Sequence, residues 1–301
     1  MAKLDANGLQ IEYDTFGDAS DDPVLLIMGL GTQMIAWSED FCNALAAHGH
    51  YVIRFDNRDI GLSTKFENAK APGRMRYVMH HVFHVPLQVP YSLEDMAADA
   101  AGVLDALGIK SAHIVGASMG GMIAQLLAIH YPRRVKTLTS MMSSSGDPHL
   151  PRARSDVVKH IFTSRPNTGN ANDMLEHLLK SAQMLGSPAY ARSPEEWREL
   201  ITMSLKRSFY PQGFIRQMAA IIDDGSRVGR LASIGKPTLV IHGSEDPLIP
   251  VEHGIDTAKH IKGAKLEIIA GMGHDIPPQL VEKLTSLIAD HARTGSTNAG
   301  D

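Results

Sequence analysis

The sequence predicts an α/β protein in which a mostly parallel central β-sheet is flanked by helices. Three observations predict this class. Short, continuous apolar runs recur along the 301 residues, as expected of strands that are buried on both faces. Segments with helical spacing separate these runs. The stretch VGASMGG at residues 115–121 then places one serine among glycines at the point where an apolar run passes directly into a helical run.

Six apolar runs are expected to form the buried strands of the sheet. They span residues 24–28, 51–55, 113–117, 135–142, 238–243 and 265–271. Residues 9–17 alternate between apolar and polar side chains, which predicts an edge strand. Among the helical segments, Ser92 and Asp95 form the pattern of a capping box that begins a helix running to Leu107, and Gly108 ends it.

The alternation of strands and helices stops between about residue 143 and residue 233. Three helical segments occupy this region: 173–185, the segment that starts at Ser193-Pro-Glu-Glu196, and 211–224. We therefore expect residues 143–233 to form a helical cap inserted between two strands, with 1–142 and 234–292 as the core. A smaller excursion covers residues 64–91. Residues 293–301 are expected to be a disordered tail.

Composition excludes several classes of protein. The net charge is −4 and no long basic run occurs, which argues against nucleic acid as a partner. We find no apolar stretch near ~18 residues, so no membrane span is expected, and the first residues lack the pattern of a signal peptide. The single cysteine, Cys42, lies at core-like helical spacing. These features fit a cytoplasmic protein, and a monomer or homodimer is expected.

Ser118 is the candidate nucleophile. The order of strand, Gly-x-Ser-x-Gly and helix is the pattern of a nucleophile elbow, a sharp turn that exposes the serine hydroxyl at the end of a central strand. Gly116 and Gly120 let the strand and the helix pass close to each other. The alternative is a glycine-rich turn with an idle serine.

A serine hydroxyl is a weak nucleophile and needs a base, which in turn needs an acid to orient it. For this elbow the expected chain order is Ser, then acid, then His. Asp246 follows the predicted strand 238–243, and His274 follows the predicted strand 265–271. Because both residues stand at the ends of parallel strands, they are expected at the same sheet edge as Ser118.

Other residues compete for the acid and base roles. Glu245 adjoins Asp246, and Asp147 follows another strand end where some relatives of such a fold keep their acid. Asp246 is preferred because the following proline fixes the turn. His242 lies inside a strand pattern and is expected to pack in the core, whereas Asp275 is interpreted as structural.

An oxyanion hole needs two backbone N–H groups near the nucleophile. Met119, directly after the serine, is expected to supply one of them. The loop LIMGLGTQ after the first buried strand is expected to supply the other, from Leu30, because Gly29 permits the turn there. Met28 makes the floor of the pocket apolar.

Taken together, the settings of Ser118, Asp246 and His274 resemble the α/β-hydrolase superfamily over nearly all of residues 9–292. The stretch FDNRDIGLS resembles that superfamily's D-x-R-G-x-G-x-S turn, with Asp59 in place of the usual glycine. Three segments, MGLGTQMIAW, IRFDNRDIGLST and GMGHDIP, resemble the aclacinomycin methylesterase group of carboxylesterases.

The resemblance implies the α/β-hydrolase fold and a serine carboxylesterase that acts on a small-molecule ester through an acyl-enzyme, without a cofactor. Other triad hydrolases stay open as alternatives: a lactone or carbon–carbon bond hydrolase, or a cofactor-free perhydrolase. The last is disfavoured because such enzymes generally carry tryptophan where this chain has Leu30. A ligand-binding receptor on the same fold, or a purely structural module, is a further alternative.

Three histidines, His80, His81 and His84, lie within one short run and raise the question of a metal site. No carboxylate is suitably placed beside them, and the serine mechanism requires no metal. The prediction is therefore no metal and a pocket wall at this segment.

Overall fold

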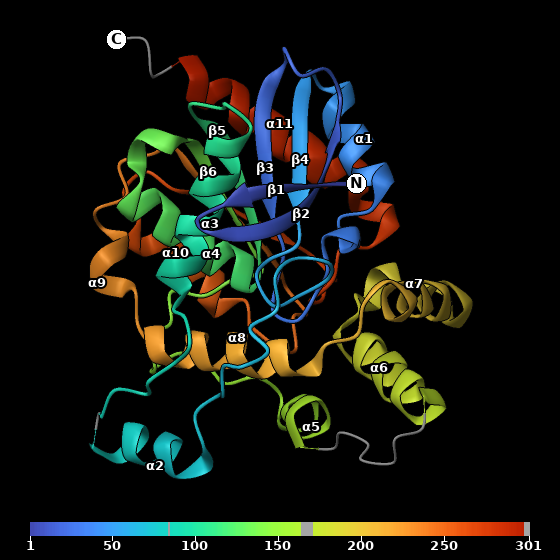
Figure 1. Ribbon diagram of the computed structural model, residues 1–301. Coiled ribbons are helices and arrows are strands. Elements are labelled where there is room, and N and C mark those ends of the chain that lie inside the picture. Colours follow the sequence, from blue (N-terminus) through green and yellow to red (C-terminus); the bar gives the residue numbers. More distant parts are fainter. Residues whose placement is uncertain (84, 164–170, 298–301) are drawn as a thin grey trace.

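The computed structural model describes residues 1–83, 85–163 and 171–297. Its centre is a sheet with the strand order β1-β2-β4-β3-β5-β6-β7-β8 (Figure 1). From β4 through β8 neighbouring strands are parallel, whereas β1 pairs antiparallel with β2, and β2 pairs antiparallel with β4. The mostly parallel sheet predicted from the sequence is confirmed.

The strand bounds agree closely with the six apolar runs. The strands are β1 Ala2–Ala6, β2 Leu9–Phe16, β3 Asp22–Ile27, β4 His50–Phe55, β5 Ala112–Ala117, β6 Val135–Met141, β7 Thr238–Gly243 and β8 Lys265–Ile269. The prediction that residues 9–17 form an edge strand is wrong, because β1 pairs along the outer side of β2. The sequence of β1, AKLDA, is too polar and too short to stand out as a strand.

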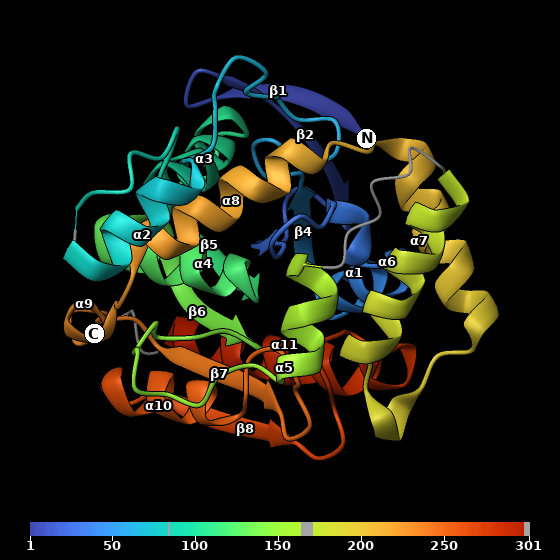
Figure 2. The same ribbon diagram turned by 90° about the horizontal axis from the view of Figure 1, so that it is seen from below.

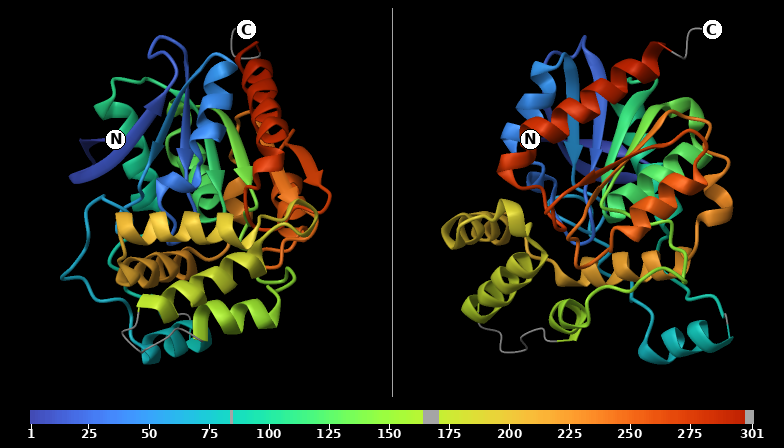
Figure 3. Two further views of the ribbon diagram at one scale, coloured as in Figure 1. Left: turned by 90° about the vertical axis from the view of Figure 1, so that its right-hand side faces the viewer. Right: turned by 180° about the vertical axis from the view of Figure 1, so that it is seen from behind.

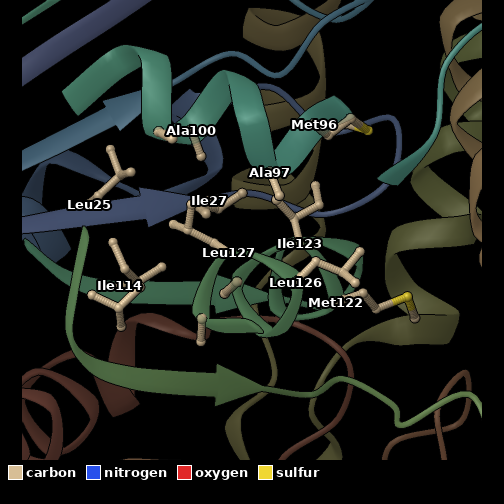
Figure 4. Close-up of a cluster of buried hydrophobic side chains, with 14 of the residues drawn as sticks. Leu25, Ile27, Met96, Ala97, Ala100, Ile114, Met122, Ile123, Leu126 and Leu127 are labelled. Atoms are coloured by element: carbon tan, nitrogen blue, oxygen red, sulfur yellow. The ribbon is translucent and has the colours of Figure 1, made fainter. Parts of the chain in front are cut away.

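Helices cover both faces of the sheet. On one face lie α3 (Leu93–Ala106) and α4 (Met119–His130), and on the other lie α1 (Glu39–Ala47) and α11 (Val281–Thr297). Successive side chains of a strand point to opposite faces, so β3 gives Leu25 and Ile27 to the first layer and Val24 and Leu26 to the second. Figure 4 shows the first layer, where side chains of α3 and α4 close over β3 and β5.

Local signals in the sequence determine where several helices begin. The capping box expected at Ser92 is present: its hydroxyl accepts from the Asp95 N–H, and the Asp95 carboxylate accepts from the Ser92 N–H. Ser193 and Glu196 form a second capping box. Beside α4 and α10 (Glu252–His260) lies α9 (Val228–Leu231), although the sequence assigned its residues to the cap, and 3₁₀ turns occur at Met34–Ala36, Pro132–Arg134 and Pro278–Leu280.

Between β6 and β7 the chain forms a separate helical layer at one end of the sheet (Figures 1 and 2). This layer consists of α5 (Ser155–Val158), which continues as a π-helix over Lys159–Thr163, then α6 (Ala171–Leu185), a 3₁₀ turn at Pro188–Tyr190, α7 (Pro194–Arg207) and α8 (Pro211–Asp224). The excursion before β5 contains α2 (Arg74–Phe83), which lies at the same end of the molecule (Figure 3). The division into a core and a cap at residues 143 and 233 stays a prediction.

The last helix extends further than expected. The tail was predicted to begin at residue 293, but α11 continues through Thr297, and Gly295 is buried beside Thr137 and Pro237. Residues 298–301 lie outside the described part of the chain. Among the helices that the structure describes, none is both long and apolar enough to cross a membrane.

Candidate active site

Ser118 stands at the junction of β5 and α4, in a backbone conformation that few non-glycine residues adopt. Its φ of 56° and ψ of −121° define a sharp turn that lifts the side chain above the end of the strand. Its N–H donates to the Met141 carbonyl at 2.9 Å, and its own carbonyl accepts from the Ser143 hydroxyl at 2.8 Å. Strain of this kind costs about 1–3 kcal/mol and tends to occur at functional sites.

The two glycines of the elbow are required by close backbone contacts. A Cβ built on Gly116 would lie 2.1 Å from the Gly120 carbonyl oxygen, and one built on Gly120 would lie 2.0 Å from the Ile27 carbonyl oxygen. No side chain can occupy either position unless β5, α4 and β3 move apart. The sequence interpretation of Gly116 and Gly120 as spacers therefore agrees with the packing.

The structure brings His274 and Asp246 to Ser118. His274 Nε2 lies 3.0 Å from Ser118 Oγ, and His274 Nδ1 lies 2.6 Å from Asp246 Oδ2. Asp246 follows β7 and His274 follows β8, as their places in the sequence predicted. Because the Asp246 carboxylate can only accept a hydrogen bond, the imidazole proton of His274 lies on Nδ1. The lone pair of Nε2 can therefore accept the Ser118 hydroxyl proton.

Asp246 is held as a carboxylate. Burial by itself would raise its pKa, but the attraction of His274, the hydrogen bond from His274 and the Ile249 N–H together lower the pKa below its ordinary value. The second carboxylate oxygen accepts from the N–H groups of Leu248 at 2.9 Å and Ile249 at 2.8 Å. Both oxygens are thus fixed, one on the loop and one on the imidazole.

The competing residues have other surroundings. Glu245 is exposed, and Asp147 accepts a hydrogen bond from the His149 N–H in its own loop. His242 is fully buried in β7, where Nε2 donates to the Ile249 carbonyl at 2.8 Å, and burial lowers its pKa. Asp275 accepts a hydrogen bond from the Ser187 hydroxyl, in keeping with a structural role.

The loop after β3 passes directly over Ser118. A Cβ on Gly29 would lie 3.0 Å from the Ser118 Cβ, so the close approach depends on glycine at this position. Leu30 and Met119 both line the cavity that contains Ser118. Met119 is the first residue of α4, and its N–H therefore has no acceptor within the helix.

Helices α7 and α8 hold this loop in place through residues that the sequence did not single out. The Gly31 N–H donates to Gln217 Oε1 of α8 at 2.9 Å, and Gln217 Nε2 donates to the Arg58 carbonyl at 2.9 Å. From the end of α7, Arg207 donates to both Gln33 Oε1 and Asp56 Oδ2. These residues lie more than 150 positions from their partners, so no local pattern could reveal them.

The loop that carries His274 is held by the cap as well. The His274 N–H donates to the Leu185 carbonyl at 2.7 Å, and the Gly273 N–H donates to the Ser187 hydroxyl at 2.8 Å. Arg192 donates to the Ile276 carbonyl at 2.6 Å. Residues 185–192, from the end of α6 to the start of α7, thus hold the loop of His274 through hydrogen bonds.

Asp59 stands where the turn of the α/β-hydrolase pattern usually has glycine. Its φ is 70°, the left-handed region in which glycine is usual and in which aspartate is among the better tolerated residues. Its carboxylate accepts two hydrogen bonds from Arg216 of α8, at 2.7 and 2.9 Å, and one from the Tyr91 hydroxyl at 2.7 Å. The aspartate therefore connects the turn to the cap, which glycine could not do.

A cavity of about 560 Å³ lies between the sheet and the helical layer α5–α8, with Ser118 and His274 in its wall. This volume is typical of pockets that bind drug-sized ligands. Most of the lining is apolar and comes from both layers, including Met28, Leu30, Met122, Leu178, Trp197, Phe214 and Met218. A largely apolar molecule of considerable size fits such a site, and Arg192 places one cationic side chain in its wall.

The histidine cluster is only partly described. His80 Nδ1 bonds to the Val85 carbonyl at 3.0 Å, whereas His84 lies outside the described residues. In the part of the chain that the structure describes, no group of three or more His, Cys, Asp or Glu side chains is arranged to hold a metal ion.

Fold and site together define a class of protein. The family model of the α/β-hydrolase fold matches residues 22–279, and the chain belongs to this family. Among solved structures, the meta-cleavage product hydrolase CumD from Pseudomonas fluorescens IP01 superposes with a TM-score of 0.77, at 21% identity and over 98% of both chains. This likeness shows the fold.

Two curated relatives are more specific. Rhodomycin D methylesterase DauP of Streptomyces sp. strain C5 is 30% identical over 299 residues, which cover 93% of this chain and 94% of that protein. A 2-hydroxy-6-oxononadienedioate/2-hydroxy-6-oxononatrienedioate hydrolase of Burkholderia vietnamiensis is 26% identical over 297 residues, which cover 96% of this chain and 93% of that protein. The comparisons confirm the resemblance to α/β-hydrolases and to methylesterases that the motifs indicated.

The contact between Gln217 and Gly31 leads to a prediction. In Gln217→Leu the hydrogen bond from the Gly31 N–H to α8 is lost, so we expect the N–H groups around Leu30 to shift. Because a misplacement of about 1 Å can cost on the order of 10² in rate, we expect kcat to fall about 10- to 100-fold while KM changes little. Steady-state kinetics on a p-nitrophenyl ester measure this.

Arg216→Lys is the matched control for this prediction. Arg216 neighbours Gln217 on α8 but anchors the helix to Asp59 rather than to the loop after β3. We expect the control to lower the melting temperature and to leave kcat nearly unchanged. If both variants lose stability and neither loses kcat, Gln217 serves the fold alone.

Proposed function

We propose that this protein is a serine carboxylesterase that hydrolyses carboxylic esters through an acyl-enzyme intermediate. The observation that carries the proposal is the continuous hydrogen-bonded chain from Asp246 through His274 to Ser118 in the wall of a large apolar cavity. The methylesterases among the relatives support the same chemistry. A small-molecule ester is the proposed substrate, and the mechanism needs no cofactor.

In the first half of the reaction His274 Nε2 takes the Ser118 proton as Oγ attacks the ester carbonyl carbon. The N–H groups of Met119 and Leu30 are proposed to hold the oxyanion. Asp246 keeps the imidazole in the required tautomer and stabilises the imidazolium. His274 then gives its proton to the leaving alcohol, and the acyl group stays on Ser118.

In the second half His274 activates a water molecule, which attacks the acyl-enzyme and releases the acid.

The side chains that line the cavity indicate which esters fit it. Since the cavity of about 560 Å³ is lined mainly by Met, Leu, Ile and aromatic side chains, we propose an ester with a bulky, apolar acyl part. The helical layer 143–233 is proposed to act as the cap that selects it.

The proposal is tested with methyl esters of aromatic polycyclic acids beside p-nitrophenyl esters of graded chain length. Turnover of the bulky methyl esters supports the proposal. Hydrolysis confined to short acyl chains would contradict the assignment of the cavity as an acyl pocket, and no hydrolysis of any ester would contradict the proposed activity.

A second candidate is carbon–carbon bond hydrolysis, which the Burkholderia relative and the superposition on CumD favour. It uses the same fold, so the site geometry alone does not separate the two reactions. A vinylogous 1,5-diketone formed by ring cleavage, assayed beside the esters, distinguishes them: the activity with the higher kcat/KM identifies the proper substrate class.

The pH dependence of the activity follows from the protonation state of Asp246. The lowered pKa of Asp246 keeps it ionised, and the stability it adds is lost only as the pH falls through that lowered pKa. The Asp246 carboxylate therefore adds no second protonation to the acid limb of the activity profile. We expect kcat/KM to fall tenfold per pH unit on this limb, with a slope of one.

A pH–rate profile between roughly pH 5 and 8 checks the prediction. A flat profile would argue against His274 as the base. A slope of two would show that Asp246 becomes protonated in the same range.

A further inference from the structure

The exposed apolar side chains gather at one end of the molecule. Among the described residues, fifteen large hydrophobic side chains are exposed, and eleven of them belong to residues 62–83 or 158–222. These segments form the cap end in Figures 1 and 3. Contiguous exposed apolar surface on a protein marks a site of interaction with a partner or a membrane.

The strongest concentration lies on α2. Its exposed apolar residues follow the spacing of one helical face, i, i+3, i+4, i+7 and i+8: Met75, Val78, Met79, Val82 and Phe83. Met75 is 74% exposed and Phe83 is 65% exposed. In Figures 1 and 3, α2 lies at the extreme cap end of the molecule, beyond α8. We call these five residues the apolar stripe of α2. A helix of this length gains most of its stability from packing an apolar face, so we expect an apolar surface to cover the stripe.

The charges around α2 indicate which surface this is. Helix α2 carries Arg74 and Arg76 and no aspartate or glutamate, and Lys70 precedes it, although the chain as a whole carries a net charge of −4. The acidic residues lie at the borders of the segment, at Glu67 and Glu94, and on α8, where Asp223 accepts from the Leu87 N–H. A second copy of the chain would oppose one cationic segment to another, which disfavours self-association through α2.

We propose that α2 is an interfacial helix that binds the surface of an anionic phospholipid bilayer. The apolar stripe would lie in the boundary between headgroups and acyl chains, and Lys70 and Arg76 would face the lipid phosphates. A helix with one apolar face, basic flanks and low overall hydrophobicity has the features of such helices. Binding would bring the cap end, which covers the cavity, to the phase in which apolar molecules concentrate.

The test is sedimentation with sucrose-loaded vesicles of phosphatidylcholine alone and of phosphatidylcholine with about 30% phosphatidylglycerol. We expect the protein to sediment with the anionic vesicles, and the bound fraction to fall as salt rises. The double variant Val78→Asp with Val82→Asp should lower the vesicle partition coefficient at least ~10-fold, because it places two charges in the boundary.

The matched control is Ile255→Asp with Ile268→Asp. These side chains are 43% and 45% exposed but lie on α10 and β8, outside the cap end. Binding should stay at the wild-type level. Circular dichroism confirms that each variant folds. Vesicle binding is measured without turnover and stands or falls separately from the esterase proposal.

Three results would overturn the proposal. The first is no binding of the wild type to either vesicle. The second is equal binding of the wild type and the α2 variant. The third is light scattering in which the wild type is a dimer and the α2 variant a monomer, which would assign the stripe to a second copy of the chain.

Discussion

Ser118→Ala is expected to lower ester turnover by a factor on the order of 10⁴–10⁶ while the protein stays folded. The hydroxyl at 3.0 Å from His274 Nε2 is the only group at the elbow that can form the acyl-enzyme in the proposed mechanism. Steady-state turnover of p-nitrophenyl esters measures the effect. Intact mass after treatment with a fluorophosphonate should show one adduct on the wild type and none on the variant.

Ser143→Ala is the matched control. Its hydroxyl lies close to the elbow and donates to the Ser118 carbonyl at 2.8 Å, but it does not contact His274 in the proposed mechanism. We expect this variant to keep most of its activity and the adduct. If Ser118→Ala retained more than about a tenth of wild-type turnover, the assignment of the nucleophile would be rejected. An adduct on the wild type without turnover of any ester would favour a receptor on this fold.

The second large effect is expected at Gly120. In Gly120→Ala the new Cβ would lie 2.0 Å from the Ile27 carbonyl oxygen and 2.9 Å from that of Met28, and both are backbone atoms that a rotamer change cannot move. Strand β3 and helix α4 would have to separate at the centre of the sheet. We expect a loss of more than about 4 kcal/mol in the free energy of unfolding, or failure to fold.

Gly229→Ala provides the comparison. Gly229 lies in α9, and nothing stands within 4 Å of the position that its Cβ would take. Alanine is favoured over glycine in helices, so this variant is expected to gain up to about 1 kcal/mol. Urea denaturation of both variants measures the difference. A Gly120→Ala protein that unfolds at the wild-type urea concentration would show that β3 and α4 are not in the close contact described.

Much of the fold could be predicted because its signals are local. Buried parallel strands appear as continuous apolar runs, so β3 to β8 are visible in the sequence, and capping boxes at Ser92 and Ser193 mark helix starts. β1 escaped notice because a short, half-exposed edge strand needs no apolar run. The end of α11 was also missed, since its last turns approach Thr137 of β6 and Pro237, which are distant in the chain and which no local pattern records.

The three proposed catalytic residues were predicted as a set for a geometric reason. Each follows a strand of the same parallel sheet, and the carboxyl ends of such strands meet at one edge, so their order along the chain implies their proximity. The hydrogen bonds from Asp246 to His274 and from His274 to Ser118 agree with this expectation.

The class of fold, the elbow glycines and the candidates for nucleophile, acid and base could all be predicted from the chain, because each depends on neighbouring residues or on strand order. The support of the loops beside Ser118 and His274 became visible only in the folded molecule. Gln217, Arg207 and Ser187 reach these loops from the cap across long stretches of chain. The physical reason is that a hydrogen bond between distant segments requires both to be folded into place, and no spacing or composition records it.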